Sequence, residues 1–372
     1  MSIWGTVAMA RRLLPRVWAH RLHRAGGPYV PPFKVKFYVT YRCNLRCAHC
    51  NLFDAPEVPN ELTTADYEHF FRRNPDLLFV SFSGGEPTLR DDLPDLVQLA
   101  ARSARRPVTV SLNLNGFLVE RSRDAVRVAL DGLDRRAKLI VLVSSDGPPS
   151  VHNRMRGHPE AYERAERTLD ALRAMEGPQL EVRRSTCVSP FNLERATAFL
   201  AQLQSSGEPH HLCFYQYGSH YDHTERHRDV YRSFRRELPA VLQQIQRTGR
   251  AADPVGRIYL DLATLYYAQR RPRSPLPCYA ADASVIVGPA GDVLPCINFS
   301  RVLGCLPDWG FELDRLLAAE RARTTRQQIR QGRCPGCWTP NEAYPTIVCN
   351  AFDRRLLAQW LRARTGRSWS GH

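Results

Sequence analysis

The feature of this 372-residue chain that most constrains its fold is a repeated alternation of strand and helix patterns. Strand patterns occur at 34–41, 77–83, 108–114, 138–145, 180–188 and 211–217. Helical patterns lie between them, at 63–73, 92–105, 121–131, 159–175 and 192–205. Strands that alternate with helices in this way favour βαβ units and a parallel sheet. Barrels of this class carry their functional residues at the carboxyl ends of the strands, so a site is expected there.

A loop with three closely spaced cysteines follows the first strand. Cys43, Cys47 and Cys50 are separated by three residues and then by two. A cubane iron–sulfur cluster has four irons, so three thiolates leave one iron without a protein ligand. An open iron binds and activates small molecules, which favours a reactive centre. Zinc is disfavoured because it usually takes four ligands. Two of them would have to come from a second pair of Cys or His residues close by.

The second strand ends in a glycine-rich turn, the Ser-Gly-Gly-Glu-Pro sequence at 83–87. Gly84 and Gly85 are expected to let the backbone pass close to a ligand. Glu86 offers a carboxylate for a cationic group.

Together, the cysteine loop and this turn resemble the radical S-adenosylmethionine (SAM) enzymes. The resemblance implies an α/β fold with a partial (β/α)6 TIM-like barrel, followed by a small α+β auxiliary-cluster domain. It also implies that the three cysteines hold a [4Fe–4S] cluster whose open iron chelates the SAM amine and carboxylate. The Gly-Gly-Glu motif would contact the amine, and His49 would lie near the adenine.

Two further strand ends carry polar side chains that are similar to motifs of the same family. Asn113 and Asn115 lie in an Asn-Leu-Asn-Gly turn after the third strand. Ser144 and Asp146 follow the fourth strand, and Arg156 lies downstream of them. The resemblance implies that these residues hold the ribose hydroxyls and the SAM carboxylate, with Arg156 supplying a charge-assisted bond to the carboxylate.

A second set of four cysteines lies near the C-terminus. Its members are Cys278, Cys296, Cys334 and Cys337. A glycine turn at Gly291 predicts a hairpin between apolar runs 284–288 and 293–297, so one small sheet would present the first two cysteines. Four thiolates suit either a fully ligated [4Fe–4S] cluster or tetrahedral zinc. The resemblance, here to the SPASM and twitch extensions of radical SAM enzymes, favours an auxiliary [4Fe–4S] cluster.

The other cysteines are less informative. Asn341 stands where many such relatives have a further cysteine, which favours one auxiliary cluster over two. Cys305 and Cys349 remain candidate ligands. Cys187 and Cys213 fall inside strand patterns and are expected to be core residues.

Composition excludes several other classes of protein. No apolar run reaches the roughly 20 residues of a membrane helix, and no signal peptide is evident. Eleven cysteines in such a chain favour metal ligation, and we expect a cytoplasmic protein. The net charge is +15, but the arginines are scattered with no basic run among aromatics, so no nucleic-acid partner is expected.

The predicted organisation has four parts. Residues 1–33 form an amphipathic N-terminal helix and linker, 34–250 the radical SAM core, 251–350 the auxiliary-cluster domain and 351–372 a basic C-terminal helix. In the first helix, the apolar side chains are expected to share one face: Ile3, Trp4, Val7, Leu14, Val17 and Trp18. That face either packs against the open end of the barrel or rests peripherally on an anionic membrane surface.

By resemblance, the reduced first cluster cleaves SAM to a 5′-deoxyadenosyl radical, which abstracts a hydrogen from the substrate. An external electron donor such as flavodoxin or ferredoxin is implied. The auxiliary cluster, with no open iron, would accept an electron from the substrate radical. The candidate bases for the accompanying proton are Glu342, Asp282 and Tyr215.

Several substrates are compatible with this chemistry. A ribosomal peptide could be oxidised or cross-linked, and a separate protein would then bind its leader, because the 33 residues before the first strand cannot hold a module of about 80–90 residues. The alternative is dehydrogenation of an aminocyclitol or sugar alcohol. A lipid substrate and a non-catalytic metal-binding scaffold are further options.

Overall fold

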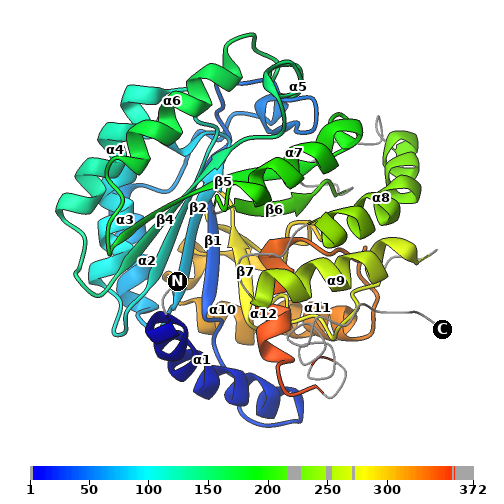
Figure 1. Ribbon diagram of the computed structural model, residues 1–372. Coiled ribbons are helices and arrows are strands. Elements are labelled where there is room, and N and C mark those ends of the chain that lie inside the picture. Colours follow the sequence, from blue (N-terminus) through cyan, green and yellow to red (C-terminus); the bar gives the residue numbers. More distant parts are fainter. Residues whose placement is uncertain are drawn as a thin grey trace.

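The computed structural model describes residues 3–208, 210–216, 228–248, 254–269, 273–353 and 356. Its strands form a single mixed sheet in the order β6-β5-β4-β3-β2-β1-β7-β8-β9 (Figure 1). The strands are β1 (Lys34–Thr40), β2 (Phe79–Gly84), β3 (Thr109–Leu114), β4 (Lys138–Ser144), β5 (Leu180–Val188), β6 (His210–Phe214), β7 (Ser284–Val287), β8 (Asp292–Leu294) and β9 (Gly304–Cys305).

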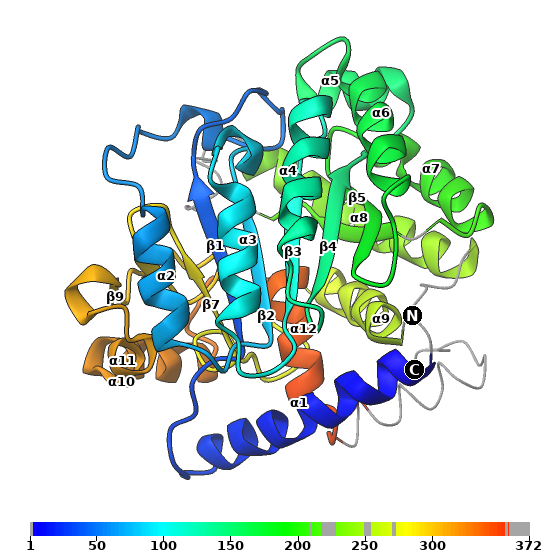
Figure 2. The ribbon, with the colours of Figure 1, turned by 90° about the vertical axis from the view of Figure 1, so that its left-hand side faces the viewer.

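Strands β1 to β6 are all parallel, as the alternating pattern predicts. The predicted partial barrel is therefore confirmed. Helices cross between the strands: α2 (Thr64–Arg73), α3 (Leu93–Arg102), α4 (Val119–Asp131), α6 (Ala161–Arg173) and α7 (Leu193–Ser205). A short helix that was not predicted, α5 (Pro149–Arg156), precedes α6 and ends at Gly157, whose φ of 71° is left-handed. Figure 2 shows α2, α3, α4 and α6 side by side over the outer face of the sheet.

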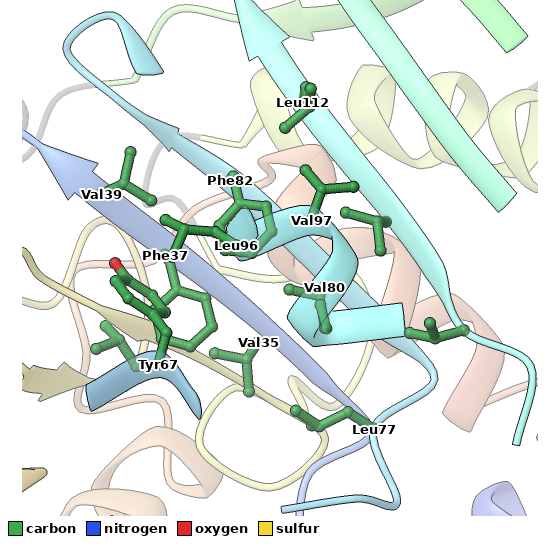
Figure 3. Packing of buried hydrophobic residues seen from close by; sticks show 14 of the residues in the cluster. Val35, Phe37, Val39, Tyr67, Leu77, Val80, Phe82, Leu96, Val97 and Leu112 are labelled. Atoms are coloured by element: carbon green, nitrogen blue, oxygen red, sulfur yellow. The ribbon is translucent and has the colours of Figure 1, made fainter. Parts of the chain in front are cut away.

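The outer face of the sheet forms the main hydrophobic core. Val35, Phe37 and Val39 of β1 point toward α2 and α3 (Figure 3). The Phe37 ring centroid lies 5.1 Å from those of both Tyr67 and Phe70. This apolar face buries the helices against the strands and fixes which strand residues point the other way.

The opposite side of the sheet, which we call the inner face, is polar. Along β3 and β5, residues on the outer face are buried while alternate residues on the inner face keep partial solvent contact. The polar inner-face residues are Lys34, Lys36, Ser111, Asn113, Lys138, Glu181, Arg183, Ser185, Cys187, His211 and Cys213. Because these residues keep solvent contact, the inner side of the barrel is not packed solid, and it offers room for a ligand.

The predicted C-terminal hairpin forms, but not as a separate sheet. β7 pairs in parallel with β1, with Lys36 opposite Ile286, and β8 and β9 then run antiparallel. Gly291 makes the turn with a φ of 90°. The strands that flank the second cysteine set therefore extend the barrel sheet, because the edge of β1 is open to pairing. The predicted domain limits stay a prediction.

The remaining helices are α8 (Arg228–Thr248), α9 (Pro254–Ala268), α10 (Leu313–Ala318), α11 (Glu320–Arg330) and α12 (Pro340–Cys349). Among the described residues, none of the helices is long and apolar enough to cross a membrane. The predicted basic helix at 351–372 lies largely outside the described residues.

Helix α1 (Ile3–Arg24) runs past the amino ends of the strands and past α12 (Figure 2). Of the predicted apolar face, Val17 is buried, and the choice between packing on the barrel and contact with a membrane surface stays a prediction. Leu14 and Trp18 are 43% and 51% exposed. The helix is rotated so that Arg16 donates to the Asp76 carbonyl oxygen. The side chains of Ile3, Trp4 and Val7 lie outside the described ones.

Candidate active site

The cysteine loop is anchored to the end of β2 by close backbone contacts. The Gly85 amide donates to the Thr40 carbonyl oxygen at 2.8 Å, and the Glu86 amide donates to the Arg42 carbonyl oxygen at 2.9 Å. A Cβ atom on Gly84 would lie 2.2 Å from the Thr40 oxygen. The glycines are therefore needed for contact between these two loops, and not only for approach to a ligand as the sequence suggested.

The Glu86 side chain is occupied within the protein. It is 1% exposed, and its carboxylate accepts hydrogen bonds from the Thr88 amide, the Thr88 hydroxyl and the Asn115 amide. Burial raises the pKa of Glu86, and these donors offset part of the shift. The predicted contact of Glu86 with the SAM amine stays a prediction, since a carboxylate has about four acceptor sites and three are filled here. The side chain also ties the ends of β2 and β3 together.

The polar residues after β3 and β4 face the cysteine loop. The side-chain nitrogen of Asn115, Nδ2, lies 4.0 Å from the Cys43 sulfur and 2.8 Å from the Asn44 side-chain oxygen. Asn113 donates to the Ser81 hydroxyl at 3.1 Å, one step further from the loop. Ser144 donates to the Leu114 carbonyl oxygen and so joins the two strand ends.

A buried ion pair connects the end of β4 to the cysteine loop. Arg156 makes two bonds to the Asp146 carboxylate, at 2.7 and 2.6 Å, and its third nitrogen lies 3.9 Å from the Cys47 sulfur. Burial alone would raise the pKa of Asp146, but Arg156 and His152 hold it below its usual value. Arg156 therefore stays charged beside a cluster ligand, a position that suits an anionic cluster or the SAM carboxylate.

Unsatisfied polar atoms on the cysteine loop show that the site fits a polar ligand. Within the described residues, Asn44 Nδ2, His49 Nδ1 and Asn51 Nδ2 are buried without a hydrogen-bond partner. Burial lowers the pKa of His49 to about 4, so its ring is neutral at pH 7. Buried polar groups are normally paired, so these atoms, beside three thiols, indicate a group that binds on this loop.

The second cysteine set also converges. Cys278, Cys296, Cys334 and Cys337 line one pocket. Burial, together with the neighbouring Cys296 and Cys334, raises the pKa of Cys278 to about 12. A hydrogen bond with Cys296, together with burial, raises the pKa of Cys337. Cys278 and Cys337 therefore favour the protonated form, and metal binding would release their protons.

The geometry of the second set suits a cluster better than a single ion. Across the described residues, no three Cys, His, Asp or Glu side chains converge closely enough to hold one metal ion. In a cubane each thiolate binds a different iron, so the sulfurs need only surround a common space. The four cysteines do this and can hold a fully ligated [4Fe–4S] cluster.

The two further candidate ligands lie elsewhere. Cys349 is fully buried in a hydrophobic cluster with Phe33 and Tyr279. Cys305 donates to the Ala290 carbonyl oxygen. Neither lines the pocket of the second set, which leaves that set with four ligands.

Of the candidate bases, Asp282 is structural. It is 1% exposed, and it accepts hydrogen bonds from Arg24 of α1 at 3.1 Å and from Arg330 of α11 at 3.0 Å, while Arg326 lies 3.5 Å away. Arg24 also donates to the Cys278 carbonyl oxygen. Asp282 thus clamps two helices beside the second cysteine set.

The other two candidate bases differ in their surroundings. Tyr215 lies in a hydrophobic cluster, with its ring centroid 6.2 Å from that of Phe234. Glu342 is 3% exposed and accepts hydrogen bonds from the Asn341 side chain at 2.6 Å and from the Ile297 amide at 3.4 Å. Its charge acts on both Cys278 and Cys337. Only Glu342 of the three adjoins both the second cysteine set and the inner face.

The two cysteine sets lie at opposite ends of the barrel. The first follows the carboxyl end of β1. Cys278 precedes β7, which is parallel to β1, and Cys296 follows β8, which is antiparallel, so both lie at the amino end. The polar inner face runs between the two sets.

Sequence reasoning missed one pair of inner-face residues. Cys187 and Cys213 are direct partners across β5 and β6, and both are half-buried on the inner face instead of in the core. The Cys187 amide donates to Asp146 at 3.0 Å. Their strict alternation with buried residues such as Val188 and Phe214 is the signal that could have placed them there.

Comparison with known proteins identifies the class. The radical SAM superfamily matches residues 37–197, the segment that holds the cysteine loop and the first strand ends. This segment is a radical SAM domain, which confirms the predicted resemblance: the protein is a radical SAM enzyme, with SAM and a SAM-binding [4Fe–4S] cluster as its cofactors.

Individual relatives cover more of the chain. PqqA peptide cyclase of Xanthomonas axonopodis pv. citri is 29% identical over 273 residues, which are 72% of this chain and 68% of the relative. AdoMet-dependent heme synthase of Oleidesulfovibrio alaskensis is 32% identical, but over only 37% of this chain and 34% of that protein.

Solved structures share the fold. anSMEcpe with bound AdoMet and a Kp18Cys peptide has a TM-score of 0.58 at 15% identity, over 89% of this chain and all of that one. SuiB of Streptococcus suis bound to S-adenosylmethionine has a TM-score of 0.54 at 16% identity, over 87% of this chain and 73% of that one. The similarity to both extends past the barrel into the region of the second cysteine set.

Proposed function

We propose that this enzyme oxidises or cross-links side chains of a ribosomally made peptide. The observation that carries this proposal is the polar inner face with one cysteine set at each end. Such an arrangement lets one end begin a radical reaction and the other end remove an electron. A net oxidation is the reaction class that uses both ends.

The peptide class of substrate is supported by the relatives. One relative is named for the PqqA peptide that it cyclises. Structures with the same fold include SuiB bound to its precursor peptide SuiA, at a TM-score of 0.51 and 15% identity. These similarities favour a peptide over the aminocyclitol or sugar alcohol that the sequence left open.

The chain's own residues then have separate tasks. When bound, the cofactors supply a carbon-centred 5′-deoxyadenosyl radical at one end and an electron acceptor at the other. Cys43, Cys47 and Cys50 hold the first cluster, and the Asp146–Arg156 pair fixes the loop that carries them. Glu342 lies beside the second cysteine set, where its carboxylate can receive the proton that the oxidised substrate releases.

Further partners follow from this reaction. The first cluster needs a small electron-transfer protein such as a flavodoxin or ferredoxin. A separate leader-binding protein would deliver the peptide. A cytoplasmic location would provide both, and eleven cysteines suit a reducing compartment.

The test is anaerobic incubation of the reconstituted enzyme with SAM, a reductant and small peptides encoded near its gene. We expect 5′-deoxyadenosine and a peptide that has lost two hydrogens. A Cys296→Ala variant should still form 5′-deoxyadenosine but no modified peptide, and Cys305→Ala is the matched control. Oxidation of a sugar alcohol, with all peptides unchanged, would overturn the proposal.

A further inference from the structure

Every lysine of this chain lies on the inner face. The sequence has 52 basic residues, and only Lys34, Lys36 and Lys138 are lysines. The first two alternate with buried residues of β1, and Lys138 begins β4. Ammonium groups are compact point charges, whereas guanidinium groups are broad and planar. The inner face thus holds all three ammonium groups of the chain, together with the guanidinium group of Arg183.

One of these lysines, Lys138, already has a carboxylate partner. Lys138 and Arg183 both pair with the Glu181 carboxylate on the inner face. These three charges sum to a single positive charge spread over a local network.

Among the described residues, the two lysines of β1 make no direct ion pair of this kind. Lys34 Nζ donates to the Asn341 carbonyl oxygen at 2.7 Å, which is a neutral partner. Burial lowers the pKa of both lysines, and the negative charge of Glu342 opposes this shift at each of them. Glu342 is itself satisfied by Thr339, Asn341 and Ile297. Two ammonium groups therefore share one carboxylate.

Lys36 has fewer polar partners than Lys34. In the described part of the chain its Nζ makes no hydrogen bond or ion pair, and its closest partner is the Tyr38 ring, 5.3 Å from Nζ to the ring centroid. A half-buried ammonium without an anion loses solvation that nothing in the protein replaces. Lys36 lies two residues from Lys34 along β1, so their Cα atoms are about 6.6 Å apart and both side chains leave the same face of the strand.

We propose that Lys36 and Lys34 bind a carboxylate of the substrate on the inner face, between the two cysteine sets. The proposal rests on the proposed function and adds to it: the substrate is a peptide with an acidic side chain, Asp or Glu, near the position that reacts. The carboxylate would accept hydrogen bonds from the two ammonium groups and thereby fix the depth of the peptide in the barrel.

His211 across the barrel completes this subsite. Burial, with Arg183, Lys36 and Lys34 nearby, lowers the pKa of His211 to about 3. The ring is therefore neutral at pH 7 and adds a hydrogen-bonding group without adding charge. Its Nδ1 lies 3.1 Å from the Ser185 hydroxyl.

A competing role for the lysines is to balance the charge of the auxiliary cluster. A four-thiolate cluster carries about −2. Glu342 adjoins both that cluster's ligands and the lysines, so the experiment has to separate the two roles.

The probes are two capped tripeptides, acetyl-Gly-Glu-Gly-amide and acetyl-Gly-Gln-Gly-amide, titrated into the holoenzyme with SAM and followed by ligand-observed NMR. We expect the glutamyl peptide to bind saturably and the glutaminyl peptide to bind about tenfold more weakly. Lys36→Met should remove this preference, and Lys36→Arg should restore part of it. Lys138→Met is the matched control and should keep it.

Two results would overturn the proposal. One is equal binding of both tripeptides, or no binding of either, to the parent enzyme. The other is an unchanged preference in Lys36→Met with a shifted midpoint potential of the auxiliary cluster, which would assign the lysine to the cluster. Binding is measured without turnover. The titration therefore tests the carboxylate subsite even if the enzyme does not modify a peptide.

Discussion

The first cysteine set lies on one short loop, whereas the second is assembled from three segments between residues 278 and 337. The first loop is fixed by hydrogen bonds with the ends of β2 and β3 and with Arg156 of α5. The second set depends on tertiary packing, including the Asp282 clamp between α1 and α11. A site built from one loop can be recognised from spacing, but a site built from distant segments requires the fold.

This difference predicts separate tasks, and the largest effect should come from the first set. Replacing Cys43, Cys47 and Cys50 by Ala should abolish 5′-deoxyadenosine formation, because no other residue can hold the SAM-binding cluster. Chromatography of anaerobic reactions with SAM and reductant measures this. Residual formation at the parent rate would mean that these cysteines do not hold the reactive cluster.

Loss of the second set should give a different result. A Cys278→Ala variant should keep 5′-deoxyadenosine formation but lose substrate oxidation, since the electron acceptor is missing. Cys349→Ala is the matched control, because that thiol is buried outside the pocket. Equal loss of both activities in Cys278→Ala would show that the two ends of the barrel do not act separately.

A smaller effect is expected at the ion pair beside the first loop. Arg156→Gln leaves the Asp146 carboxylate buried without its cation and should destabilise the fold by about 3–5 kcal/mol. Urea unfolding of the metal-free protein measures this free energy. The exposed Arg154→Gln should change it little, and equal effects of the two variants would contradict the proposed pairing.

The smallest effect concerns pH and comes from His20 of α1. Burial lowers the pKa of His20 to about 4 in the folded state, below its ordinary value of 6.5. Between these values the unfolded chain binds more protons, so stability falls as pH falls. His20 should contribute a loss of about 2 kcal/mol between pH 7 and pH 5.

The control for this prediction is His20→Leu, which removes the titration. Urea unfolding of parent and variant at both pH values isolates the His20 contribution from those of His49 and His152, whose pKa values are also lowered. The same pH dependence in both proteins would contradict it.

Most of the barrel could be predicted from the sequence because strand periodicity and helix amphipathicity are local properties. The six parallel strands lie within a few residues of their predicted limits. The hydrogen bonds to the Glu86 carboxylate and the pairing of Cys187 with Cys213 could not be predicted, because both depend on which strands are neighbours.

Helix α1 also shows what a local sequence pattern cannot predict. Its apolar pattern predicts that Val17 and Trp18 share one face, but does not say which of them is buried. In the structure Arg16 and Arg24 of this helix make long-range ion pairs, Val17 is buried and Trp18 is exposed.

The most direct test of two separate clusters is the iron content of anaerobically reconstituted protein. The parent enzyme should bind about eight irons per chain. The Cys43/Cys47/Cys50→Ala variant and the Cys278/Cys296/Cys334/Cys337→Ala variant should each keep about four. About four irons in the parent enzyme, or zinc held by the second set, would contradict the account.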